Sequence, residues 1–98
     1  MRAFARDALT MTDEALRAEI KQAIVRSLRL PIKAVDIGDD VPLFGEGLGL
    51  DSIDVLELVL ELERAFGASI TDEETGTRVL RTVNTITEFV RANGKLGP

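Results

Sequence analysis

The sequence predicts an all-α fold, a four-helix bundle of three longer helices and one short helix, with a long loop between the first and second helices. Three observations support this prediction. Apolar residues recur at intervals of three and four in several segments, a helix-start residue precedes each segment, and no segment alternates apolar and polar residues as a half-buried strand does. A chain of 98 residues, 45% of them hydrophobic, can bury one small core.

The first helix is expected to begin at Thr12, a good N-cap residue followed by two acidic side chains that complement the helix dipole. Its inward face consists of Leu16, Ile20, Ala23, Ile24, Ser27 and Leu28. Pro31 should stop this helix near Leu30, because proline disfavours helical geometry in the residue before it. Residues 1–11 show no periodicity and are expected to form a flexible lead-in.

Residues 31–50 contain two prolines and four glycines, so neither a continuous helix nor a strand is expected there. Loops of this length in small domains often carry function. The segment is too apolar to hang in solvent, and several of its apolar residues should anchor it across the bundle: Val35, Ile37, Val41, Leu43, Phe44, Leu48 and Leu50. A short helical turn can form at 33–37 or at 41–44.

The second helix should run from Ser52 to Phe66 and end at Gly67. Asp51 is the expected N-cap, and Asp54 is placed to complete a capping box with it. One apolar stripe forms the core face: Val55, Leu58, Val59, Leu62 and Phe66. A second stripe consists of Ile53, Leu56 and Leu60. It either lines a cavity, forms an exposed contact surface, or packs beneath the long loop.

Thr71-Asp72-Glu73-Glu74 is a further helix-start signal, and Gly76 should keep the helix short, at about 72–79. The last helix is expected at 83–92, before the stop signal Asn93-Gly94, with four residues facing inward: Val83, Ile86, Phe89 and Val90. The folded domain therefore spans 12–93, and 94–98 form a loose tail.

The charge is distributed unevenly along the chain. The net charge is −5 overall, but residues 36–74 carry −11 while the segments on either side carry +3 each. A concentrated acidic surface repels nucleic acid and attracts basic partner proteins. The simpler alternative is that these charges only keep an apolar helix soluble.

Composition excludes several kinds of chemistry. The chain has no cysteine, which excludes a thiol nucleophile, and no histidine, which excludes a Ser-His-Asp triad. No catalytic residue is therefore predicted. The loop glycines do not match a phosphate-binding loop. Four loop acids miss the EF-hand spacing, so no metal site is predicted: Asp36, Asp39, Asp40 and Glu46.

No stretch is apolar enough to span a membrane, and the first residues lack the apolar core of a signal peptide. A cytoplasmic protein with neither membrane insertion nor bound nucleic acid is therefore expected.

Ser52 is the candidate functional residue. At the first position of a helix its hydroxyl lies beside unpaired backbone N–H groups, a favourable place for a phosphate. The run Leu48-Gly49-Leu50-Asp51-Ser52-Ile53-Asp54, with Glu57-Leu58, resembles the L-G-x-D-S-[LI]-D-x-x-E-L signature of acyl carrier proteins. The resemblance extends over about 12–93, and the glycine-rich loop and Arg64-Ala65 are closer to a specialised stand-alone member than to the housekeeping one.

The resemblance implies that Ser52, within the Asp51-Ser52 motif, receives 4′-phosphopantetheine from coenzyme A through a phosphodiester bond made by a separate, Mg²⁺-dependent phosphopantetheinyl transferase. The arm then carries acyl groups as thioesters. The implied partners are acyl synthases or ligases, ketosynthases, reductases and dehydratases of fatty-acid, polyketide or related lipid biosynthesis. A monomer without enzymatic activity of its own is expected.

These partners would present basic docking patches to the second helix. The residues expected to meet them are Ile53, Asp54, Leu56, Glu57, Leu60, Glu61 and Glu63. Two alternatives are an unloaded, carrier-like scaffold or regulatory module, and a small helical enzyme. The intact Asp51-Ser52 argues against the first, and the missing histidine and cysteine argue against the second.

Overall fold

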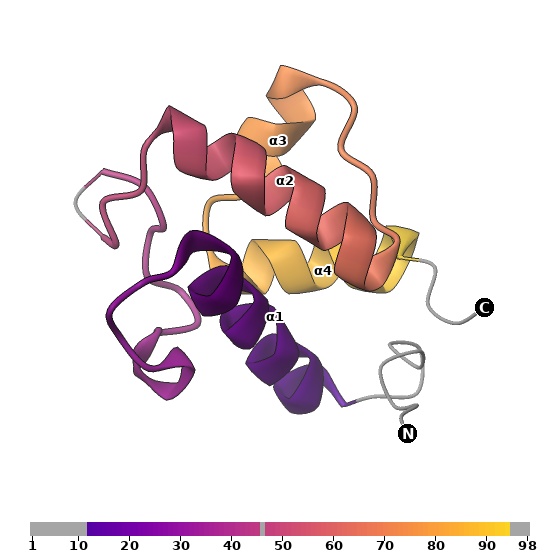
Figure 1. Ribbon diagram of the computed structural model, residues 1–98. Helices are drawn as coiled ribbons and strands as arrows, with labels where there is room; N and C mark the ends of the chain where they lie inside the picture. Colours follow the sequence, from indigo (N-terminus) through magenta and orange to yellow (C-terminus); the bar gives the residue numbers. More distant parts are fainter. Residues whose placement is uncertain (1–11, 46, 95–98) are drawn as a thin grey trace.

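A computed structural model describes residues 12–45 and 47–94, which form four α-helices and one 3₁₀ turn. In chain order these are α1 (Asp13–Leu28), η2 (Ala34–Asp36), α2 (Ser52–Phe66), α3 (Glu73–Val79) and α4 (Val83–Asn93) (Figure 1). Three longer helices and one short one confirm the predicted fold class. The expected lead-in at 1–11 and nearly all of the expected tail lie outside the described residues, so the domain bounds stay a prediction.

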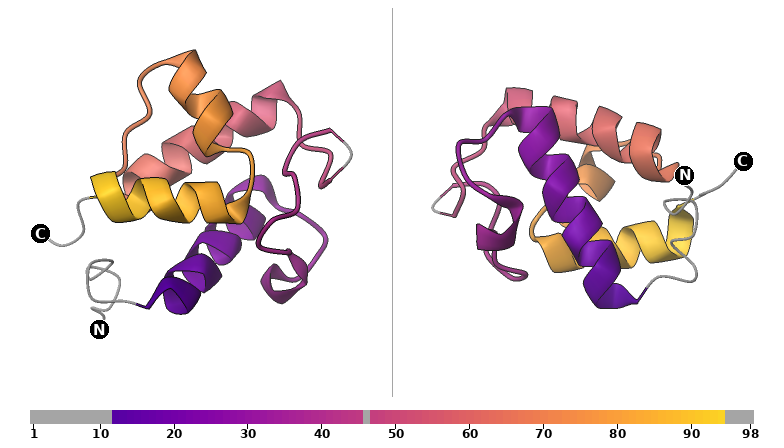
Figure 2. Two further views of the ribbon diagram at one scale, coloured as in Figure 1. Left: turned by 180° about the vertical axis from the view of Figure 1, so that it is seen from behind. Right: turned by 60° about the horizontal axis from the view of Figure 1, so that its bottom comes forward.

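The helices enclose one core. α1 packs against α2 and α4, while α3 packs against α4 on the side of the molecule away from α1 (Figures 1 and 2). The predicted inward positions of α1 are confirmed at Leu16, Ile20, Ala23 and Ile24, all fully buried. On α2, Leu58, Leu62 and Phe66 are buried, whereas Val55 and Val59 are half-buried beside the core.

The end of α1 differs from the prediction. The helix stops at Leu28, two residues before the predicted end, because Arg29 turns into the left-handed region with φ of 52°. The Arg29 N–H then donates to the Val25 carbonyl, which satisfies one of the last free acceptors of the helix. Pro31 disfavours helical geometry at Leu30, so the helix closes just upstream. The bounds of α3 and α4 agree with the prediction to within one residue.

The loop from 31 to 50 lies across the bundle as expected. η2 confirms the first of the two turns that the sequence allowed. Ile37, Leu43 and Leu50 are buried anchors, but Val35 is 81% exposed. The Leu43 N–H donates to the Arg81 carbonyl at 2.9 Å and the Leu50 N–H donates to the Leu43 carbonyl at 3.1 Å, so the loop is fixed to the α3–α4 connection just ahead of α2.

Gly47 is the tightest glycine position of this loop. A Cβ on Gly47 would lie 1.6 Å from the Pro42 carbonyl oxygen, so a side chain there would displace the backbone. The Leu48 N–H donates to the same carbonyl at 3.0 Å, and Phe44 and Leu50 form an isolated bridge. These contacts determine the direction in which the chain enters α2. Among the described residues, no helix is both long and apolar enough to cross a membrane.

Candidate functional site

The N-terminus of α2 is held by the predicted capping box. Asp51 Oδ1 accepts the N–H groups of Ile53 and Asp54, each at 3.1 Å, and Asp54 Oδ2 accepts the Asp51 N–H at 2.9 Å. These reciprocal bonds fix the backbone on both sides of Ser52. Both carboxylates are engaged in capping, which leaves the serine hydroxyl as the free reactive group at this helix end.

Ser52 is exposed, and it lines a cavity of about 610 Å³ between α2 and α3. The apolar wall of the cavity consists of Phe44, Val55, Leu56, Val59, Ile70 and Leu80. Its polar lining consists of Ser52, Thr71, Asp72, Glu73 and Thr77, and Gly76 contributes bare backbone. The serine hydroxyl therefore lies where an apolar hollow meets solvent.

The rest of α2 presents a mixed face to solvent. Ile53, Leu56 and Leu60 are 71%, 65% and 59% exposed, so this stripe does not pack beneath the long loop. Glu57 and Glu63 are exposed beside it, while Asp54 is half-buried in its capping bonds. Three large apolar side chains exposed on one helix, with carboxylates between them, are typical of a contact surface.

Comparison with known proteins identifies the family. Residues 18–90 match the family described as phosphopantetheine attachment site, and 75 residues are 36% identical to the acyl carrier protein of Phytoplasma australiense, over 76% of this chain and 92% of that protein. The chain belongs to the acyl carrier protein family. A solved structure of the acyl carrier protein from Enterococcus faecalis agrees in fold, with a TM-score of 0.63 and 30% identity over 85% of this chain and 99% of that one.

Acyl carrier proteins are carriers rather than enzymes, and their prosthetic group is 4′-phosphopantetheine. The site in this carrier fits such a group. Ser52 is exposed at the N-terminus of a 15-residue helix, where the helix dipole favours the negative charge of a phosphodiester. A hollow with an apolar wall lies directly beside this position.

The structure corrects one residue of the predicted docking face, Glu61. Its side chain is only 3% exposed, and its two carboxylate oxygens bond Arg26 Nη2 of α1, at 2.6 Å, and Arg64 Nη2 on the next turn of α2. The prediction that Glu61 meets partner proteins from the surface is wrong. Its position on α2 faces α1, so its carboxylate joins two helices instead of facing solvent.

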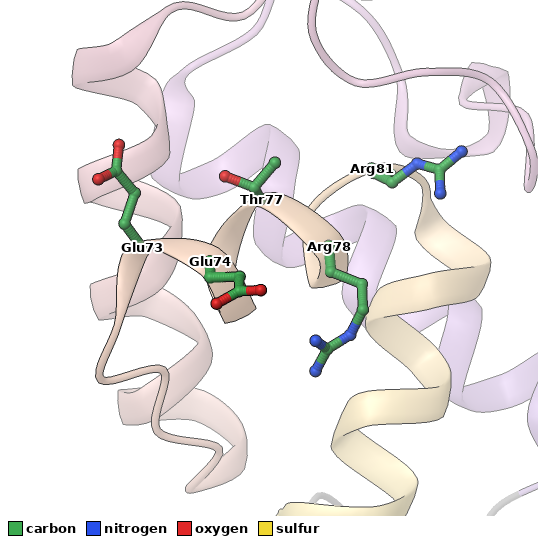
Figure 3. A pocket seen from close by; sticks show the side chains of 5 residues that line it. All are labelled: Glu73, Glu74, Thr77, Arg78 and Arg81. Carbon is green, nitrogen blue, oxygen red and sulfur yellow. The ribbon is translucent and has the colours of Figure 1, made fainter.

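A second hollow, of about 540 Å³, lies on the outer side of α3 (Figure 3). Its charges are of both signs, from Glu73 and Glu74 and from Arg78 and Arg81. The two arginine side chains point in different directions, so they do not converge on one anion (Figure 3). This hollow therefore lacks the apolar wall and the serine that make the cavity beside Ser52 a candidate site in the carrier.

Two of the loop acids, Asp39 and Asp40, make structural contacts in this carrier. Asp39 lies 2.6 Å from Lys21 Nζ and 3.4 Å from Arg17 Nε, both on α1, and the hydrogen bond from Lys21 is the main reason that the pKa of Asp39 lies below its usual value. Asp40 accepts a 2.6 Å bond from the Asn84 side chain. Within 12–45 and 47–94, no cluster of three or more acidic side chains is arranged to hold a metal ion.

Sequence reasoning missed several residues that shape the site. It assigned no role at the carrier site to Phe44, Ile70 or Leu80, because periodicity indicates which residues are apolar but not which helices face each other. Sequence reasoning also assigned no role to Arg26. No sequence signal links Arg26 to Glu61, 35 residues away.

Proposed function

We propose that Ser52 carries the 4′-phosphopantetheine arm and that the protein delivers acyl thioesters on this arm to enzymes of fatty-acid, polyketide or related lipid biosynthesis. The observation that carries the proposal is the exposed Ser52 hydroxyl, at a capped helix N-terminus and on the edge of an apolar cavity. The family match identifies the prosthetic group, and this geometry supports Ser52 as its attachment point.

The chain's own residues have defined tasks in this function. Asp51 and Asp54 hold the first turn of α2 in one conformation, so the Ser52 hydroxyl is presented to the transferase in a constant geometry. Because Asp51 already accepts the N–H groups of Ile53 and Asp54, it is the positive end of the α2 dipole that would stabilise the charge of a phosphodiester on Ser52. The apolar wall of the cavity lowers the free energy of an acyl group that leaves water to enter it.

Partner enzymes would dock on the exposed face of α2. Ile53, Leu56 and Leu60 offer apolar contact next to Ser52, and Asp54, Glu57 and Glu63 are placed to meet basic side chains. Contacts of this kind give fast and reversible association, which a shuttle between enzymes requires. The proposed setting is the cytoplasm, and the glycine-rich approach to α2 favours a specialised stand-alone carrier.

The decisive experiment is enzymatic loading. Wild-type protein is incubated with coenzyme A, Mg²⁺ and a promiscuous phosphopantetheinyl transferase, and its intact mass is measured. Wild type should gain the mass of one arm, Ser52→Ala should gain none, and Ser69→Ala, which removes an exposed serine beyond α2, should load as wild type does. If wild type stays unmodified while a control carrier is loaded, the protein is not a loaded shuttle, and an unloaded scaffold becomes the better explanation.

A further inference from the structure

The C-terminal half of α2 exposes positive charge on what is otherwise an acidic docking face. Arg64 and Arg26 have side-chain exposures of 76% and 61%, although each directs one guanidinium nitrogen to Glu61. Glu61 itself is buried between them. Two arginines and one glutamate give this cluster a net charge of +1, counted without the exposed Glu63 next to Arg64.

Arg64 lies in line with the proposed docking residues. Residues three and four positions apart share one face of a helix, so Ile53, Glu57, Leu60 and Arg64 form a single outer row along α2. Beginning next to Ser52, the row is apolar, acidic, apolar and then basic. A partner that covers Leu60 therefore also comes within reach of Arg64.

Both guanidinium groups can make further bonds. Each carries five N–H donors in a planar fork, and the contact with Glu61 engages one nitrogen of each. The remaining donors suit a carboxylate, which arginine can hold through two parallel hydrogen bonds. A lysine or arginine in the same place would instead meet a charge of its own sign.

We propose that the outer face of α2 is a docking surface of two opposite charges, which fits a partner with basic side chains near Ser52 and Glu57 and a carboxylate opposite the Arg26–Arg64 pair. This inference rests on the proposed carrier function and specifies its partner. The basic end attracts enzymes that bear an acidic residue at the edge of their patch. It weakens docking to enzymes whose patch is basic throughout.

A charge swap with a defined enzyme tests the inference. The probe is a ketosynthase whose carrier-docking patch contains only lysine and arginine, together with its variant in which the patch residue facing the C-terminal half of α2 is changed to glutamate. Acyl-loaded carriers are compared by kcat/KM for transfer of the acyl group to the enzyme. Complete loading is first verified by intact mass.

With the all-basic enzyme, Arg64→Glu should raise kcat/KM by about two- to fivefold, because a like-charge contact is removed. With the glutamate-bearing enzyme, wild type should be the better substrate by a similar factor. The kcat/KM of Arg64→Gln should lie between those of wild type and Arg64→Glu. Because Arg64→Gln keeps hydrogen-bond donors for Glu61, it also tests the inference if Arg64→Glu weakens the fold. Arg81→Glu, the same charge change between α3 and α4, is the matched control.

Equal values for wild type and Arg64→Gln with both enzymes would overturn the inference, as would an equal effect of Arg81→Glu. A wild-type protein that cannot be loaded at all would instead refute the proposed function. The two failures are therefore distinguishable.

Discussion

Arg26 of α1 and Glu61 of α2 are joined by a 2.6 Å hydrogen bond across 35 residues of sequence. Arg64 holds the other oxygen of the same carboxylate. The most buried acid of α2 therefore belongs to the fold rather than to the docking face. This division between structural and available carboxylates leads to the first two predictions.

Glu61→Gln should lower the free energy of unfolding by about 1–2 kcal/mol, because it removes charge-assisted hydrogen bonds that join α1 to α2. Both arginines are largely exposed and can be solvated by water, which limits the loss. Urea unfolding followed by circular dichroism measures it. Glu57→Gln, on the exposed side of the same helix, should change stability by less than about 0.5 kcal/mol. Equal effects of the two substitutions would contradict this assignment.

Glu57→Lys should slow loading of Ser52 by the transferase without a matching loss of stability. Its reversed charge weakens long-range attraction to a basic partner, so the effect falls on association and should diminish as salt screens the charges. Loading rates at low and high salt are the measurement, with Glu88→Lys on α4 as the control of equal charge change. A deficit that is the same at all salt concentrations would argue against electrostatic docking.

The capping box should contribute measurably to stability. Asp51→Ala removes the acceptor for two N–H groups and should cost about 1 kcal/mol, whereas Asp51→Asn keeps an acceptor oxygen and should cost less. Chemical unfolding of the three proteins provides the comparison. If the alanine variant is as stable as wild type, Asp51 does not hold the start of α2.

Acidification should remove the contribution of Asp39 to the stability of the fold. Its pKa is lowered in the folded protein by the Lys21 hydrogen bond and by the positive charges of Lys21 and Arg17, so the ionised form favours folding. That stability is fully present above the unfolded-state pKa, near pH 4, and is lost as pH falls through the lower folded-state value.

Asp39→Asn should therefore be less stable than wild type at neutral pH, and the difference should shrink on acidification. Urea midpoints measured at pH 7 and at about pH 3 give this comparison, with Asp36→Asn on the exposed side of η2 as the control. A difference that does not change with pH would show that the interaction of Asp39 with α1 is not electrostatic.

Gly76→Ala should stabilise the protein by up to about 1 kcal/mol, because glycine inside a helix is less favourable than alanine. The added Cβ would lie 3.4 Å from Ile70 Cγ2, an ordinary contact. It also takes space from the cavity beside Ser52. We expect the Gly76→Ala protein to have a higher midpoint of thermal unfolding. We also expect faster hydrolysis of the thioester when this protein carries a long acyl chain. A lower midpoint would mean that the contact between Gly76 and Ile70 cannot accept the methyl group.

The helices, their caps and the serine that begins α2 could all be predicted from the amino-acid sequence. These features depend on local chemistry: three- and four-residue apolar spacing, Asp51 and Asp54 three residues apart, and proline or glycine where a helix must end. The resemblance to the family motif indicated Ser52 as the functional residue.

The exposure of each acidic residue of α2 could not be predicted from the sequence, because it depends on how the helices pack. Glu57 and Glu61 look equivalent along the chain, yet one faces solvent and the other lies beneath Arg26. The same holds for the cavity, whose walls come from the loop after α1, from α2, from the connection between α2 and α3, and from α3. The physical reason is that burial and ion pairing depend on which helix faces cross, and that arrangement comes from packing the whole core.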